Sequence, residues 1–304
     1  MGRTLYVINP AGNGGAGIRV WQRIRRAHEG VIDADDVRHT ERPGHARELA
    51  AGTDGVDLIV AVGGDGTAGE VLSGIMDRPE PRPRLAILPA GTGNDIARQV
   101  GAFPLERAIA ALEAGEAATY DLIRIDCRVD GAPATRHAFV YGTAGFSALL
   151  KFRPWMKRFL GATVGSYLSM ILALFEFRPP VMKLVWDDGS VNERLWMAVI
   201  ANAERAAGAS MHIAPGARTD DGRLDVSLIP AKSKPMMLAT LLPKVPSGRH
   251  VEDPQVRYFR TTAITVETDV PMLVEIDGDI HGRTPATFAV RPCAVEIVGT
   301  TAPR

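Results

Sequence analysis

The chain contains the stretch LIVAV at residues 58–62, followed directly by GGDGT at residues 63–67. Five apolar residues, three of them β-branched, predict a strand that is buried on both faces, as in a parallel sheet. The glycines that follow let the backbone turn sharply and bring its N–H groups close to a ligand. Thr67 is predicted to cap the helix whose apolar pattern comes next.

The chemistry of this turn is that of an anion site. A glycine turn that leads into a helix N-terminus favours phosphate as a ligand. Asp65 does not fit a simple phosphate site, because its carboxylate repels phosphate unless a cation lies between them. It therefore indicates Mg²⁺, the oxygen-ligated ion that usually accompanies nucleotide phosphates. The alternative is a plain glycine-rich β-turn in which Asp65 serves only as a cap.

The same order of strand, glycine turn and helix recurs twice more in the first hundred residues. Residues 5–8 predict a strand that leads into a glycine-rich turn at 9–17, and residues 84–88 predict one that leads into PAGTGND at 89–95. This alternation favours a doubly wound, Rossmann-like parallel sheet, whose ligands bind at the carboxyl ends of the strands. Three glycine turns at one edge indicate a binding site far more strongly than one.

After about residue 118 the pattern changes to short apolar runs separated mostly by Gly, Pro, Asp and Asn turns. It predicts a mainly antiparallel β domain of sandwich type. Two last runs, at 288–290 and 294–298, would finish that domain or return to the first. We therefore expect an α/β domain at 1–125, a β-rich domain at 126–285 and a C-terminal segment at 286–304.

The overall charge is balanced, since Lys plus Arg and Asp plus Glu each number 35. This balance predicts no nucleic-acid partner, and any attraction to an anionic surface must be local. Cys127 and Cys293 provide neither metal-ligand spacing nor a disulfide framework, which favours a reducing cytoplasm. The first residues hold too short an apolar run for a signal peptide.

One segment, at 149–178, breaks the β pattern: basic and aromatic residues open it, and an uncharged run follows at 160–175. Sixteen such residues fall short of a membrane span. Basic and aromatic side chains beside an apolar helix are typical of an element that lies at a membrane surface. A core helix that joins the domains is the alternative. We expect reversible membrane association through Lys151, Arg153, Trp155, Lys157 and Arg158.

These motifs resemble those of the soluble diacylglycerol and sphingosine kinase superfamily. GGDGT at 63–67, with Glu70 and Val71 after it, resembles the family's nucleotide signature, whose glycine–aspartate core NAD-type kinases share. Matches specific to the lipid kinase branch are NPAGNG at 9–14, HTERPGHA at 39–46, PAGTGND at 89–95, ANA at 201–203, APGA at 214–217 and DDGRLD at 220–225. The resemblance spans nearly the whole chain in order and spacing.

The resemblance implies an ATP-dependent kinase that transfers the γ-phosphoryl group to a lipid hydroxyl, that of diacylglycerol or a related lipid alcohol. ATP would lie between the α/β domain and the β-rich domain that takes the lipid acceptor. By motif position, the residues expected to contact ATP are Asn9, Pro10, Ala11, Gly12, Asn13, Thr40, Gly64, Asp65, Gly66, Thr67, Glu70, Thr92 and Asp95.

The resemblance also implies two Mg²⁺ sites. Asp65 and Asp95 would serve the catalytic ion and the acidic network around it. A structural ion would be held by the Asp221 carboxylate with the backbone carbonyls of Arg218 and Arg223. The alternative for residues 220–222, which precede the strand predicted from Leu224, is a simple turn into that strand.

Two positions depart from the family pattern. Gly69 stands where the family usually has Asn, and Asp279 stands where it has the Glu that acts as general base. An alcohol needs a carboxylate within hydrogen-bond reach to take its proton. We expect Asp279 to be that base, with Asp65 as the runner-up and Asp277 as a structural turn residue.

Two other functions stay open. One is an NAD-type kinase, against which the basic-aromatic segment and the ANA motif argue. The other is a catalytically weak or silent lipid- or nucleotide-binding protein, which the changes at Gly69 and Asp279 allow. We expect a cytoplasmic protein that associates peripherally with the membrane, and a homodimer is a candidate assembly.

Overall fold

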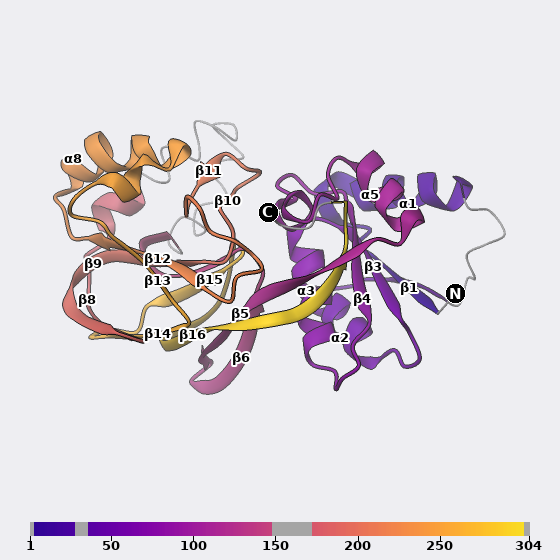
Figure 1. The fold of residues 1–304 in the computed structure, drawn as a ribbon, viewed down its shortest axis with the longest axis horizontal. Coiled ribbons are helices and arrows are strands. Elements are labelled where there is room, and N and C mark those ends of the chain that lie inside the picture. The colour runs from indigo at the N-terminus through magenta and orange to yellow at the C-terminus, as the bar shows by residue number, and fades with distance from the viewer. Residues whose placement is uncertain (1–2, 28–35, 148–171, 301–304) are drawn as a thin grey trace.

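The computed structural model describes residues 3–27, 36–147 and 172–300. Two halves lie side by side, and strands β5 (Ala117–Val129) and β16 (Asp279–Val298) run between them (Figure 1). No helix in the described ranges is long and apolar enough to cross a membrane. The basic-aromatic residues at 151–158 lie outside the described residues.

The N-terminal half is built on four parallel strands in the order β2-β1-β3-β4. The run predicted at 58–62 lies inside this sheet, where Val60 and Val62 are fully buried. The strands are β1 (Thr4–Ile8), β2 (Val37–His39), β3 (Leu58–Gly63) and β4 (Arg84–Pro89). The helices are η1 (Gly12–Gly15), α1 (Ala16–Ala27), α2 (His45–Gly52), α3 (Asp65–Met76), α4 (Asp95–Gln99) and α5 (Leu105–Ala114).

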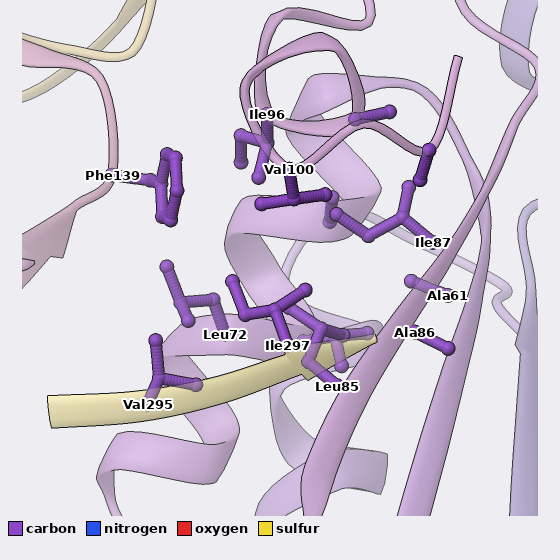
Figure 2. Close-up of a cluster of buried hydrophobic side chains, with 14 of the residues drawn as sticks. Ala61, Leu72, Leu85, Ala86, Ile87, Ile96, Val100, Phe139, Val295 and Ile297 are labelled. Carbon is purple, nitrogen blue, oxygen red and sulfur yellow. The ribbon is translucent and has the colours of Figure 1, made fainter. Parts of the chain in front are cut away.

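A buried cluster ties the end of the chain to this half (Figure 2). Leu72 of α3, Leu85 of β4 and Ile297 of β16 are each fully buried in it. Burying one such side chain contributes about 1.5–3 kcal/mol. Ile297 also pairs with Leu85 in the parallel sense, so β16 extends the parallel sheet beyond β4.

The strands of the C-terminal half are antiparallel, and their pairing closes on itself. β9 pairs with β7 and β8, β7 continues through β15 to β16, and β16 returns through β14 to β8. This pairing joins the layers of the expected sandwich into a barrel-like sheet. Alternating patterns predict which face of a strand is buried, but they are the same for sandwiches and barrels.

The remaining elements of the C-terminal half have the following bounds. The strands are β6 (Ala132–Ala138), β7 (Tyr141–Gly145), β8 (Val181–Trp186), β9 (Gly189–Ala201), β10 (Arg205–Ala206), β11 (Met211–His212), β12 (Leu224–Pro230), β13 (Arg257–Thr261), β14 (Ala263–Thr268) and β15 (Leu273–Ile276). The helical elements are residues 172–176, α8 (Lys234–Met236), η4 (Met237–Leu241), η5 (Leu242–Ser247) and η6 (Arg249–Glu252).

The start of α3 corrects the prediction that Thr67 is its cap. The helix begins at Asp65, after the N-cap residue Gly64, so Thr67 lies inside the first turn. Its hydroxyl accepts a hydrogen bond from the side-chain amide of Asn9 (Nδ2–Oγ1 3.0 Å). The prediction was wrong because that tertiary partner, and not the start of the helix, uses the hydroxyl.

The last two apolar runs, 288–290 and 294–298, belong to one strand and not to two. β16 continues through Pro292 and Cys293, and its register with β5 shifts between Arg291 and Val295. Proline has no N–H to donate, and Cys293 has a φ of 50°, so the extra residues bulge out of the ladder. The residues between the two apolar runs are therefore those of the bulge.

Candidate active site

Three glycine-rich turns meet at the carboxyl edge of the parallel sheet, as the sequence predicts. The Asn9 side chain, after β1, donates to Thr67 of α3 and accepts two backbone N–H bonds of its own turn at 3.0 Å each. The Asn13 side chain donates to the carbonyl of Ala90, after β4 (3.3 Å). These bonds join the first turn to the other two.

The second and third turns touch through two glycines. A Cβ added to Gly64 would lie 2.9 Å from the Cα of Gly91, and one added to Gly91 would lie 2.5 Å from the Cα of Gly64. A side chain at either position would push the turns apart. The three turns enclose a hollow of about 230 Å³, lined by Asn9, Gly12, Asn13, Gly17, Gly63, Gly64, Gly66, Thr67, Ala90, Gly91 and Thr92.

A second hollow, of about 300 Å³, also borders Gly66 and lies between the two halves. The N-terminal half contributes Pro43, Gly44, Arg47, Asp65, Gly66, Gly69, Glu70 and Ser73, and the C-terminal half contributes Arg136, His137, Ile276, Asp277, Asp279 and His281. Of the residues predicted to contact ATP, Pro10, Ala11, Thr40 and Asp95 line neither hollow.

Sequence reasoning missed Arg136, His137 and His281. His281 lies two residues from Asp279 on β16, and alternate residues of a strand face the same side, so that spacing could have indicated it. The other two come from β6, and no motif marks them. Burial lowers the pKa of His137 to about 4.

Asp65, in the first turn of α3, lies close to Asp95. Its Oδ1 accepts the backbone N–H of Ile96 (3.2 Å). Burial raises the pKa of Asp65, the Ile96 bond opposes that rise, and the Asp95 carboxylate adds to it. A Cβ added to Gly93 would lie 2.8 Å from Oδ2 of Asp65 and 3.6 Å from Oδ2 of Asp95. Both carboxylates therefore face the space beside Gly93.

The residues around Gly93 fit a Mg²⁺ ion. Carboxylate oxygens are the ligands that Mg²⁺ prefers, and a cation relieves the repulsion of two neighbouring carboxylates. Within the described ranges no group of three or more His, Cys, Asp or Glu side chains is arranged as a metal site. Mg²⁺ usually keeps several waters and phosphate oxygens beside one or two carboxylates, so Asp65 and Asp95 suffice in number.

Asp277, in the turn between β15 and β16, anchors β7 to the site. Its carboxylate accepts the backbone N–H groups of Phe139 (2.7 Å), Val140 (2.9 Å) and Tyr141 (2.8 Å). Burial raises its pKa to about 6 against the effect of these three bonds, and the Asp65 carboxylate adds to the rise. This arrangement accords with the structural role that the sequence suggests.

Asp279 begins β16 and is exposed at the mouth of the second hollow. Its Oδ2 lies 3.8 Å from the position that a Cβ on Gly66 would take. The chain thus brings a carboxylate of the C-terminal half opposite the glycine turn of the N-terminal half, across more than 200 residues of sequence.

Three further positions lie beside the site. The Glu70 carboxylate accepts the backbone N–H groups of Gly44 (2.8 Å) and Ala46 (3.2 Å), at the start of α2. Thr40 follows β2, and its N–H donates to the end of β1 (2.8 Å). A Cβ on Gly69 would meet nothing within 4 Å, so the family's Asn would fit there.

The Asp-Asp-Gly loop carries its own network. Asp221 accepts the backbone N–H of Arg223 at Oδ1 (3.0 Å), and Arg218 pairs through its guanidinium with Asp220 (3.0 Å). The loop also packs against Asp121, whose buried carboxylate accepts the N–H of Gly222 (2.7 Å). These bonds fix the loop in which the family resemblance implies a second metal site.

Arg260 of β13 supplies a cation to this loop. Its Nη1 lies 3.5 Å from Oδ2 of Asp221, and its Nε donates to Oδ1 of Asp225 (3.1 Å). Asp225 is buried, and its Oδ2 has no hydrogen-bond partner in the described structure. A metal ion at Asp221 would therefore share that carboxylate with a guanidinium.

Comparisons with known proteins cover both halves. Residues 3–125 match the family model of the diacylglycerol kinase catalytic domain, and residues 144–299 match that of the YegS C-terminal NAD kinase beta sandwich-like domain. A diacylglycerol kinase of Mycobacterium tuberculosis is 30% identical over 98% of this chain and 95% of its own. A diacylglycerol kinase of Bacillus subtilis is 25% identical over 84% of this chain and 79% of its own.

A solved structure shares the fold. The crystal structure of a diacylglycerol kinase from Bacillus anthracis superimposes with a TM-score of 0.69 at 19% identity, and the match covers 98% of this chain and 97% of that one. At this identity the likeness establishes the fold alone. The two family models and the relatives go further and confirm the resemblance seen in the motifs: the chain belongs to the diacylglycerol kinase family of lipid kinases.

Proposed function

We propose that the protein is an ATP-dependent kinase that transfers the γ-phosphoryl group to the hydroxyl of a diacylglycerol-like or related lipid alcohol. The position of Asp279 carries the proposal, since its Oδ2 lies 3.8 Å from the Cβ position of Gly66. A candidate base therefore borders the turn that we expect to hold the phosphates. Phosphoryl transfer needs those two parts within reach of each other.

The phosphates of ATP are assigned to the glycine hollow. Small residues and close backbone approach make room there, and the N-terminus of α3 points a partial positive charge toward it. Thr40 and Glu70 would lie along the rest of the nucleotide, as their motif positions imply.

The family usually has Asn at the position of Gly69, and the space there is open. Gly69→Asn should therefore tighten ATP binding by up to about tenfold, the effect of one hydrogen bond.

Asp65 and Asp95 would hold the catalytic Mg²⁺, which when bound neutralises charge on the transferring group. Asp279 would accept the proton of the lipid hydroxyl as its oxygen attacks the γ-phosphorus. Asp65 suits the role of general base less well, because Ile96 already donates to one of its oxygens and the other faces Gly93. A second ion at Asp221, with the carbonyls of Arg218 and Arg223, belongs to the proposal and would have to bind beside Arg260.

The domain boundaries belong to the proposal as well. We divide the chain into a doubly wound nucleotide domain at 1–125, a β-rich acceptor domain at 126–285 and a returning segment at 286–304. The strand order β2-β1-β3-β4 and the pairing of Ile297 with Leu85 support this division.

Peripheral association with the membrane is proposed for the basic-aromatic segment. Each basic residue near an anionic surface is worth about 1 kcal/mol. Charge reversal at Lys151, Arg153, Lys157 and Arg158 should therefore release the protein from anionic liposomes in a sedimentation assay. Light scattering of the same preparation would test the predicted homodimer.

An ATP-consumption assay with and without lipid micelles tests the function. Lipid-dependent turnover, with labelled phosphate recovered in the lipid, is the expected result. Phosphate transfer to NAD instead would favour the NAD-type kinase. Binding of ATP without turnover on any lipid alcohol of a broad panel would overturn the kinase proposal in favour of a silent binding protein.

A further inference from the structure

A tight turn at 207–209 reaches from the C-terminal half to the helix that carries Asp95. It joins β10 to β11, and its three residues Ala207, Gly208 and Ala209 have φ values of 56°, 69° and 64°. This left-handed region is uncommon for residues other than glycine. Two alanines held there indicate that surrounding contacts maintain the conformation.

The contacts that maintain it come from α4, more than 100 residues away in the chain. Oδ1 of Asp95 accepts the backbone N–H of Gly208 at 2.7 Å and that of Ala209 at 3.4 Å. The Gln99 side chain donates to the carbonyl of Arg205 (3.3 Å). Successive backbone N–H groups in a turn form a concave anion-binding site, and here the anion is the Asp95 carboxylate.

The turn occupies one oxygen of Asp95 and leaves the other directed at the cation site. Oδ2 lies 3.6 Å from the Cβ position of Gly93, and Oδ2 of Asp65 lies 2.8 Å from the same point. The backbone nitrogen of Gly208 lies 3.7 Å from that point. The turn, Gly93 and the two carboxylates therefore surround one space.

We propose that the 207–209 turn is a positioning element for the catalytic cation. By holding Oδ1 it fixes the rotation of the Asp95 side chain, so that Oδ2 faces Asp65 and the pair is ready to bind Mg²⁺. Because Gly208 and Asp95 lie 113 residues apart in the chain, the turn also makes cation binding depend on the tertiary packing that brings them together. The inference rests on the Mg²⁺ site proposed above.

The first test measures the turn without metal or nucleotide. In the intact protein, the Gly208 amide should exchange slowly with solvent deuterium by NMR. In Asp95→Ala it should exchange at least about tenfold faster, the factor expected for a hydrogen bond to a charged group. The Ile213 amide, which donates to the Glu204 carbonyl at the base of the same hairpin (2.8 Å), is the control and should not change. Equal exchange of Gly208 in both proteins would overturn the proposal, whether or not the protein is a kinase.

The second test changes the turn without touching a carboxylate. Ala209→Gly keeps the N–H and favours positive φ, whereas Ala209→Val carries a β-branched side chain that disfavours it. Mn²⁺, followed by electron paramagnetic resonance, serves as the probe. The Val variant should bind Mn²⁺ about tenfold more weakly than the Gly variant, and its Mg²⁺ concentration for half-maximal turnover should rise by a similar factor. Equal Mn²⁺ affinity in two folded variants would overturn the proposal. If the Val variant does not fold, the exchange test decides alone.

Discussion

Two clusters of carboxylates in this molecule are stabilised in different ways. The interdomain cluster, between the halves, comprises Asp65, Asp95 and Asp277. The loop cluster, beside β13, comprises Asp221 and Asp225. Carboxylates of the interdomain cluster accept backbone N–H groups. Asp221 of the loop cluster accepts one as well, but both carboxylates of that cluster also contact the guanidinium of Arg260. Burial raises the pKa of carboxylates in both.

The difference lies in how much net charge is cancelled. Backbone N–H groups satisfy the lone pairs of a carboxylate but carry only partial charges, so most of its negative charge remains. A guanidinium supplies a full positive charge that is always present. The interdomain cluster is therefore suited to a cation that arrives with the nucleotide, and the loop cluster already holds a permanent one.

The largest expected effect is at Asp65. Asp65→Asn should lower kcat by about a thousandfold or more, because charge neutralisation by a metal is worth several kcal/mol and each 1.36 kcal/mol is tenfold in rate. The amide oxygen can still accept the Ile96 N–H, so the circular dichroism melt should match that of the unaltered protein. Near-normal turnover at ordinary Mg²⁺ would show that the interdomain cluster does not hold the ion.

Asp279 lines the same hollow as Asp65 and Asp277, on the side that we propose for the lipid acceptor. Asp279→Asn should lower kcat by about two to four orders of magnitude, the usual contribution of a general base, with ATP binding almost unchanged. Asp279→Glu restores the family's side chain and should retain or raise turnover. ATP binding is measured by isothermal titration, and its loss in both variants would mean that Asp279 has a structural role. Full turnover of Asp279→Asn in the kinase assay would instead assign the base to Asp65.

Asp277 should impose a pH dependence on stability. Its folded-state pKa is raised from 3.8 to about 6, so its protonated form is favoured by folding. This contribution, up to about 3 kcal/mol, is fully present below pH 3.8 and is lost as the pH rises through about 6. In urea unfolding from pH 3.5 to 7, the free energy of unfolding of the unaltered protein should fall by up to this amount relative to that of Asp277→Asn, because the shifted pKa values of Asp65, Asp225 and His137 are common to both proteins. If the free energies of unfolding of the two proteins followed parallel pH profiles, burial could not be the main influence on the pKa of Asp277.

The smallest expected effect is at the loop cluster. Arg260→Met should lower the free energy of unfolding by about 1–2 kcal/mol, less than a fully buried pair, because the guanidinium is partly exposed. Arg257→Met, on the same strand, removes a surface pair with Glu193 and is the control, with an expected loss under about 0.5 kcal/mol. Millimolar Mg²⁺ should restore part of the Arg260→Met loss in thermal melts. No restoration would argue against a metal ion at Asp221.

The interdomain cluster could be predicted in part. Asp65 and Asp95 each follow a glycine turn after a buried strand, and parallel neighbours bring such turns to one edge. Asp279 entered only through the family resemblance. Gly208, which holds Asp95, was missed, because a short alanine–glycine turn carries no pattern that names a partner in the other half. Arg260 was missed because the pattern of its strand, β13, names no partner in the loop at Asp221.

The sequence by itself determined the local elements: the buried strand at 58–62, the glycine turn after it, and the strand–turn–helix order of the first half. Apolar periodicity and the φ freedom of glycine act within a few residues, so they can be read without a structure. Tertiary structure decided the rest. β7 is a strand because it lies between β9 and β15, and a Cβ on its Gly142 would lie 2.7 Å from the Phe288 ring. Likewise the orientation of Asp95 depends on a backbone N–H 113 residues away, and only the packing of the two halves brings that group into reach.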